Sequence, residues 1–113
     1  VLLQAPCAEN QPLVSYTLMP TNIRGYFDAA TLATAELVPG SRFTNGTPCL
    51  RYTENSLYLQ PQRFGTLMFD LKQDPAQQHP ISDSALAAAL RKKLAAAMRA
   101  ADAPAEEFQR LGL

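Results

Sequence analysis

The chain has no tryptophan, a single histidine, two cysteines and no excess of either charge, since 10 Lys and Arg balance 10 Asp and Glu. A nucleic-acid-binding protein usually carries a basic surplus that neutralises phosphates, so this balance argues against a nucleic-acid partner. No apolar stretch approaches the roughly 20 residues that a membrane-spanning helix requires. The sequence also lacks the glycine-rich, metal-binding and nucleophile motifs of common enzymes, and it implies no cofactor.

What is present fits a small globular protein. Hydrophobic residues make up 47% of the 113 positions and charged residues 18%, a balance that argues against intrinsic disorder. The length suits one domain with one small core. We expect an irregular N-terminal segment over residues 1–12, followed by a single domain over residues 13–113.

Cys7 and Cys49 are the only cysteines, and they form no C-x-x-C motif, so a redox pair or a zinc site has no support. In an oxidising compartment they could pair, and the chain-entropy model values such a cross-link at about 4 kcal/mol. In a cytosolic protein they would be two unrelated buried thiols. Because the weakly patterned N-terminal segment would gain most from a covalent link, we expect a disulfide and a periplasmic or secreted protein.

Alternating apolar and polar residues predict the strands. Residues 13–18 form one half-buried strand, and residues 49–60 form a hairpin with a two-residue loop. In that hairpin Leu50 would face Leu59 and Tyr52 would face Leu57 on one apolar side. Residues 64–71 predict a third strand, with a bulge at Gly65 or a three-residue turn and with Phe64 on the core face.

Two further segments carry local signals. Residues 28–38 read best as a helix, with Asp28 as N-cap and Phe27 contacting Leu32, because a hairpin turn at Pro39-Gly40 would pair apolar with polar residues. A strand over these residues stays the alternative. Asn45-Gly46 is typical of a turn that needs positive φ.

The alanine-rich C-terminal part predicts a helix over residues 82–101, with Ser82 as N-cap, and a further turn or two of helix over 105–111. At 100° per residue, the predicted core stripe consists of Leu86, Leu90, Leu94, Ala97, Met98 and Ala101. The opposite face consists of alanines, namely Ala85, Ala88, Ala89, Ala95 and Ala96, beside Lys92 and Arg99. Alanine is the best helix former, but such a face also suits contact with a partner.

The candidate binding residues lie on two predicted surfaces. On the outer face of the 49–60 hairpin, Arg51 would stack on Tyr58, and Met68 and Lys72 would continue that face. On the alanine face of the long helix the candidates are Lys92 and Arg99. A solvated surface without a partner is the plainer interpretation of both.

Catalysis would have to involve His79, the only imidazole. Its partners could be Cys49, Ser82 or Ser84 as nucleophile and Asp74 or Asp83 as the orienting group. Nothing but sequence proximity brings some of these together, so an exposed linker histidine is the better interpretation.

These observations predict an α+β fold, a small antiparallel β-meander with the long C-terminal helix packed on one face. The function that fits them is a non-catalytic, extracytoplasmic protein-binding module, such as an inhibitor, an immunity protein or an accessory subunit of an envelope assembly. Its partner would be another protein or a second copy of the chain. The alternatives are a small-ligand or lipid-binding domain that uses the groove between sheet and helix, and a small hydrolase that uses His79.

Overall fold

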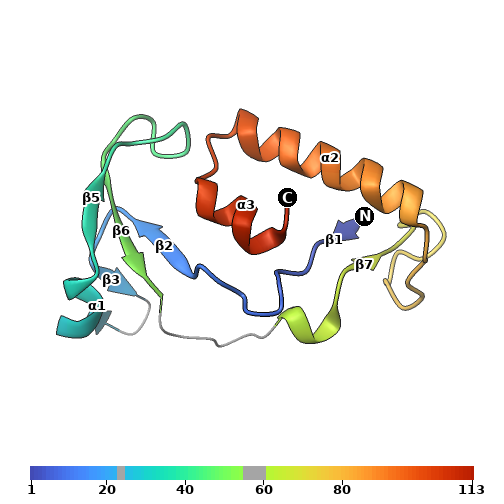
Figure 1. Cartoon of the computed structure of the whole chain (residues 1–113), viewed down its shortest axis with the longest axis horizontal. Coiled ribbons are helices and arrows are strands. Elements are labelled where there is room, and N and C mark those ends of the chain that lie inside the picture. Colours follow the sequence, from blue (N-terminus) through green and yellow to red (C-terminus); the bar gives the residue numbers. More distant parts are fainter. Residues whose placement is uncertain (23–24, 55–60) are drawn as a thin grey trace. The chain divides into compact units, whose positions relative to one another are not determined.

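The computed structural model describes residues 1–22, 25–54 and 61–113 of the chain (Figure 1). The chain divides into two compact units, one made of Val1–Gln11 and Leu59–Leu113 and the other of Pro12–Tyr58. We call them unit 1 and unit 2. The division differs from the predicted irregular segment and single domain, because the N-terminal residues pack with the C-terminal half of the sequence.

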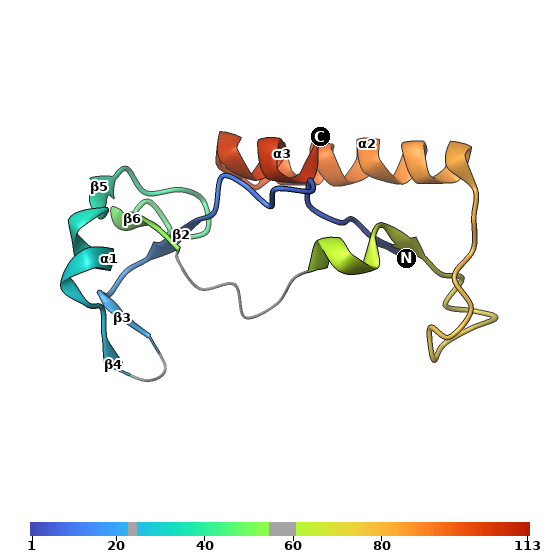
Figure 2. The same ribbon diagram turned by 60° about the horizontal axis from the view of Figure 1, so that its bottom comes forward.

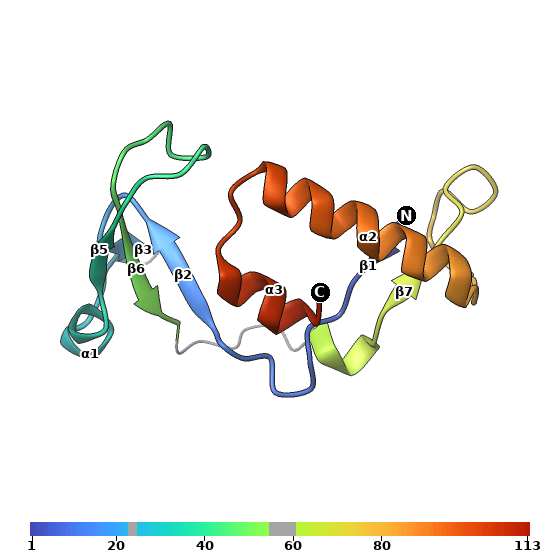
Figure 3. The same ribbon diagram turned by 45° about the horizontal axis from the view of Figure 1, so that its top comes forward.

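Unit 2 is built on a three-stranded antiparallel sheet in the order β2-β6-β5, which can be followed in Figures 1 and 3. The strands are β2 (Val14–Thr17), β5 (Glu36–Val38) and β6 (Cys49–Thr53). The position of β2 confirms the strand predicted over residues 13–18. In the central strand, Leu50 lies opposite Thr17 on one side and opposite Leu37 on the other.

The predicted hairpin over residues 49–60 is wrong in its pairing. Both edges of β6 are taken by β2 and β5 at Leu50 and Arg51, so these residues have no edge left for residues 57–60. Residues 55–60, which include the predicted turn and Leu57, Tyr58 and Leu59, lie outside the described residues. Alternation identified which residues of β6 share a face, but not which strand lies beside it.

Residues 28–38 form a short helix followed by a strand, so both of the structures considered for this segment are present. Helix α1 covers only Ala29–Ala33, and Asp28 is its N-cap as predicted, accepting a hydrogen bond from Thr31 N at 2.7 Å. The segment then becomes β5, which pairs with β6 and not across the Pro39-Gly40 turn. Phe27, before α1, packs against Tyr52 of β6 with ring centroids 4.6 Å apart and ring planes tilted by 46°. A short ladder of β3 (Thr21–Asn22) and β4 (Gly25–Tyr26) extends from this region (Figure 2).

Unit 1 joins the two ends of the chain. Strand β1 (Leu2–Leu3) pairs antiparallel with β7 (Leu67–Met68), and the long helix α2 (Ser84–Ala100) contacts β1. Helix α3 (Ala105–Leu111) folds back beside α2 (Figure 1), where the Arg99 guanidinium lies 5.5 Å from the centre of the Phe108 ring. Met68, Phe69 and Ala95 are the buried apolar residues of this unit among those described. The α+β class is confirmed, but α2 packs on β1 of its own unit, while the three-stranded sheet belongs to unit 2.

The third predicted strand, residues 64–71, is mostly wrong. Residues Pro61–Phe64 form a 3₁₀ helix, η1, and only Leu67–Met68 are β-strand. Phe64, placed by the sequence on the core face, is 76% exposed. Gly65 has a φ of +64°, a left-handed conformation that glycine adopts without strain. The bulge or three-residue turn predicted here would pair this strand with residues 57–60, which lie outside the described residues.

The C-terminal helices follow the prediction closely. The N-cap of α2 is Asp83 and not Ser82, since Asp83 Oδ1 accepts a hydrogen bond from Leu86 N at 2.9 Å. The buried stripe is rotated from the predicted one, because Ala95 is buried whereas Ala97 is exposed. Helix α3 ends at Gly112, whose φ of +63° caps it in the left-handed conformation.

Candidate functional site

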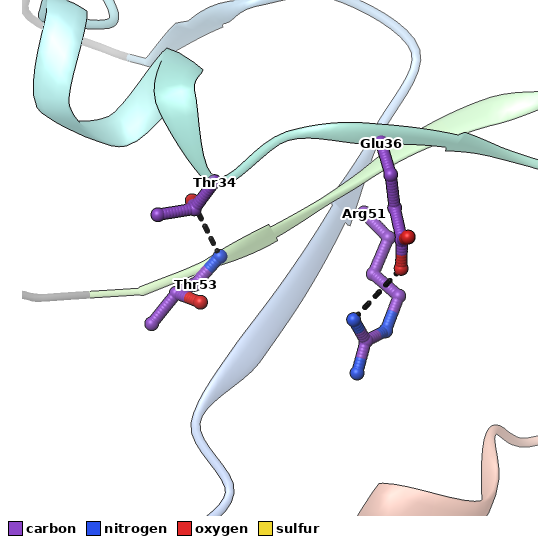
Figure 4. A network of polar contacts seen from close by, with 4 residues as sticks. All are labelled: Thr34, Glu36, Arg51 and Thr53. Atoms are coloured by element: carbon purple, nitrogen blue, oxygen red, sulfur yellow. Dashed lines mark hydrogen bonds and ion pairs between the residues drawn. The ribbon is translucent and has the colours of Figure 1, made fainter.

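An ion pair joins the central and edge strands of the unit 2 sheet (Figure 4). Arg51 Nη1 lies 2.9 Å from Glu36 Oε1, and these residues are direct cross-strand partners. Tyr16 lies opposite Arg51 on the other neighbour, β2. Because the Arg51 and Glu36 side chains are 33% and 58% exposed, the pair contributes no more than about 1 kcal/mol.

The outer edge of β5 offers backbone groups to a partner at one residue. Thr53 N donates to Thr34 Oγ1 at 3.0 Å on the β5 side of the sheet (Figure 4), and Glu54 N donates to Leu13 O on the β2 side. Since these directions alternate along a strand, Leu50 faces β2. Its partner Leu37 therefore directs its backbone N–H and C=O away from β6, where no further strand lies among the described residues.

This open edge is short. The N–H of Ala35 donates to Leu32 O at 3.0 Å, and Pro39 has no N–H to donate. A proline and a short strand are common protections against edge-to-edge aggregation. A partner would therefore gain little from extending the sheet and more from the Leu37 side chain, which is 72% exposed.

Large apolar side chains are more often exposed than buried in unit 2. The described buried ones are Val14, Cys49 and Tyr52. The exposed ones are Tyr16, Leu18, Met19, Tyr26, Leu32, Leu37 and Phe43. Three of these, Tyr26 (85%), Leu37 (72%) and Phe43 (79%), are almost fully solvated. Single exposed apolar residues are normal, but this ratio in so small a unit marks it as a surface suited to a partner.

Phe43 is presented by a closed loop that joins β5 to β6. Ser41 O accepts hydrogen bonds from Thr44 N at 3.2 Å and from Gly46 N at 3.0 Å, and Thr44 Oγ1 accepts one from Ser41 N. Asn45 and Gly46 have φ angles of +50° and +78°, which confirms the positive φ predicted for this dipeptide. The loop is therefore an ordered support for an exposed aromatic ring. The sequence reasoning missed Phe43, although an aromatic residue between turn signals was visible.

The described residues among the predicted binding residues divide between the two units, with Arg51 in unit 2 and the others in unit 1. Met68, predicted on an exposed face, is only 4% exposed and belongs to unit 1, because β7 pairs with β1 and not with β6. Lys72, in the loop after β7, is exposed, and Lys92 and Arg99 are exposed on α2. Tyr58 lies outside the described residues, so the predicted stacking of Arg51 on it is untested. Of the alanine face, Ala85, Ala88, Ala89 and Ala96 are exposed.

Unit 1 has an open groove with a volume of about 430 Å³, lined by residues of the N-terminal segment, of the turn before β7 and of helices α2 and α3. Gln4 connects its walls. Gln4 Oε1 accepts a hydrogen bond from Arg91 Nε at 2.9 Å, and Gln4 Nε2 donates to Leu111 O at 3.1 Å. Nothing in the local sequence around Gln4 predicts these contacts, which span 87 and 107 residues.

The two cysteines are free thiols in the structure and belong to different units. Cys7 is half-buried in the groove of unit 1, where its N–H donates to Arg110 O at 2.7 Å. Cys49 is buried in β6. The disulfide between them stays a prediction.

His79 is 83% exposed at the end of a loop that Asp74 organises. The Asp74 carboxylate accepts hydrogen bonds from the N–H of His79 at 2.8 Å and of Gln78 at 3.0 Å, and these bonds lower the pKa of the carboxyl below its ordinary value. The His79 ring lies 3.9 Å from Asp74 Oδ1 through Nδ1. Among the described residues, no serine or cysteine hydrogen-bonds to this ring.

The chain matches no protein-family model, no curated protein and no solved structure with which it was compared. In the parts of the chain that the structure covers, no helix has the length and apolar character to cross a membrane. Over the same residues, no three of the histidine, cysteine, aspartate and glutamate side chains are grouped as a metal site would need.

Proposed function

We propose that this protein is a non-catalytic protein-binding module and that its partner covers the exposed apolar side chains of unit 2. The observation that carries the proposal is the exposure of Tyr26, Leu37 and Phe43 in a unit whose described apolar core has only three buried residues. Removing an apolar side chain from water contributes roughly 1.5–3 kcal/mol. Covering these three would offset a substantial part of the free-energy cost of association.

The loop around Phe43 is ordered by its own hydrogen bonds, which supports a binding surface that is formed before the partner arrives. An aromatic ring on a hydrogen-bonded loop loses little conformational entropy when it binds, which is why rigid aromatic residues are common hot spots of interfaces. Leu37 adds an apolar side chain on the edge strand that leads into the same loop. Inhibitors, immunity proteins and accessory subunits act through surfaces of this kind, by occupying a partner.

Site-specific photo-crosslinking in the native source tests this proposal. Benzoylphenylalanine in place of Leu37 or of Phe43 should give one discrete adduct with the same protein, either another chain or a second copy. Gln73, exposed in unit 1, is the matched control position and should give at most a faint adduct. The substitution Phe43→Ser should abolish the adduct formed from position 37 and leave the near-UV circular dichroism of the tyrosines unchanged. An adduct of equal yield from position 73, or none from 37 and 43, contradicts the proposal.

The same proposal places the protein outside the cytoplasm, on the basis of the expected Cys7–Cys49 disulfide. Intact mass spectrometry of protein from its native source should show a gain of two hydrogens on reduction. Two thiols that react with an alkylating reagent before reduction would contradict this part alone.

A further inference from the structure

We propose that the groove of unit 1 binds a small organic carboxylate, with the Arg91 guanidinium as its charged partner. The lining residues include one permanent cation, Arg91, and no carboxylate. Among the described residues, no Asp or Glu pairs with Arg91 elsewhere in the fold. The electrostatics of the groove therefore favour an anion.

Arg91 is held in place before a ligand arrives. Its Nε–H donates to Gln4 Oε1 at 2.9 Å, and the Gln4 amide is fixed in turn by its hydrogen bonds to Leu111 O and Ala5 O, both at 3.1 Å. Because the amide nitrogen faces two carbonyls, the amide oxygen must face Arg91. The described part of the chain uses one of the five guanidinium N–H groups of Arg91. A guanidinium binds a carboxylate through two parallel hydrogen bonds.

The rest of the lining indicates the kind of carboxylate. Ala5, Pro6, Ala8 and Leu111 give the groove an apolar part beside the charge. A volume of about 430 Å³ lies in the range of small-molecule sites. An acid with a short apolar tail would satisfy both parts. It could be a free organic acid or the C-terminal carboxylate of a peptide, which share this chemistry.

A titration of the isotope-labelled full chain, followed by amide NMR, tests the site with hexanoate as the probe. Saturable shifts should appear at the amides of Gly65, Thr66 and Gly112, which line the groove. Hexanol, which has the same tail and no charge, should give none. Arg91 is exposed and its pairing with a carboxylate is partly screened by water, so Arg91→Gln should weaken hexanoate binding several-fold. Arg63→Gln, which changes an exposed arginine outside the lining, should bind hexanoate like the unchanged protein.

Two further arms define the ligand. The tripeptide Ala-Ala-Leu tests whether the natural ligand is a peptide C-terminus or a free organic acid. The peptide with a free C-terminus is compared with hexanoate, and the same peptide with an amidated C-terminus should not bind. Because Arg91→Gln also removes the contact with Gln4, Arg91→Lys serves as the second variant and should retain part of the affinity. Equal shifts with hexanol, equal affinity of Arg91→Gln, or equal affinity for inorganic phosphate would overturn the carboxylate site.

Discussion

Gly40, at the start of the loop that carries Phe43, has no room for a single added methyl group. A Cβ added there would overlap the carbonyl group of Gly46 and would lie 2.5 Å from Thr47 O. All of these are backbone atoms, so no side chain can rotate to make room. Gly40→Ala must therefore push the strand-to-loop junction away from the 46–47 peptide.

The expected loss in the free energy of unfolding follows from the backbone hydrogen bonds that this movement strains. Gly46 N donates to Ser41 O at 3.0 Å, and Thr47 N donates to Thr44 O at 3.0 Å. Each is worth about 0.5–1.5 kcal/mol net, and overpacking typically costs about 1–3 kcal/mol, so we expect a loss of about 2 kcal/mol. For a small unit with an m-value near 1 kcal/mol/M in urea, the unfolding midpoint should fall by about 2 M.

Near-UV circular dichroism during urea unfolding measures this loss in unit 2. The sequence has four tyrosines, all within residues 12–58, and no tryptophan, so the signal comes from this unit. Gly46→Ala is the matched control, because a Cβ there meets no atom within 4 Å but the φ of +78° costs about 1 kcal/mol. A midpoint for Gly40→Ala equal to that of the unchanged protein, or above that of Gly46→Ala, would refute the close approach of the loop to itself.

Two further predictions concern unit 1. Asp83→Ala should destabilise α2 by about 1 kcal/mol because it removes the N-cap, whereas the control Ser82→Ala should have little effect. Thermal unfolding followed by far-UV circular dichroism measures both variants. Equal effects of the two substitutions would contradict the assignment of Asp83 as the cap. The pKa of Asp74 is lowered chiefly by the hydrogen bond from His79 N, so its contribution to stability is present above the unfolded-state pKa and is lost as the pH falls through the folded-state pKa. A carboxyl titration by NMR should give Asp74 a pKa below that of Asp74 in the urea-unfolded chain, and Asp74→Asn should remove this pH dependence; a pKa equal in both states would contradict it.

Sequence alone identified the features that depend on a few neighbouring residues. Asp28 as an N-cap, β2, the positive φ of Asn45-Gly46 and the extents of α2 and α3 all follow from propensities, caps and turns that act within one or two turns of chain. Such signals depend little on the rest of the fold, because the groups that satisfy them are close in sequence. The exposure of His79, which was predicted from its polar linker, is confirmed.

Only the tertiary structure decided which elements meet. The period-2 pattern of β6 fixes which side chains share a face, but it is equally compatible with any antiparallel neighbour, so it could not choose β2 and β5 over residues 57–60. For the same reason the pairing of β1 with β7, and with it the burial of Met68, was invisible to local reasoning. The walls of the groove around Gln4 and Arg91 are likewise joined by hydrogen bonds between residues 87 and 107 positions apart. No local pattern in the sequence indicates that these residues lie close together.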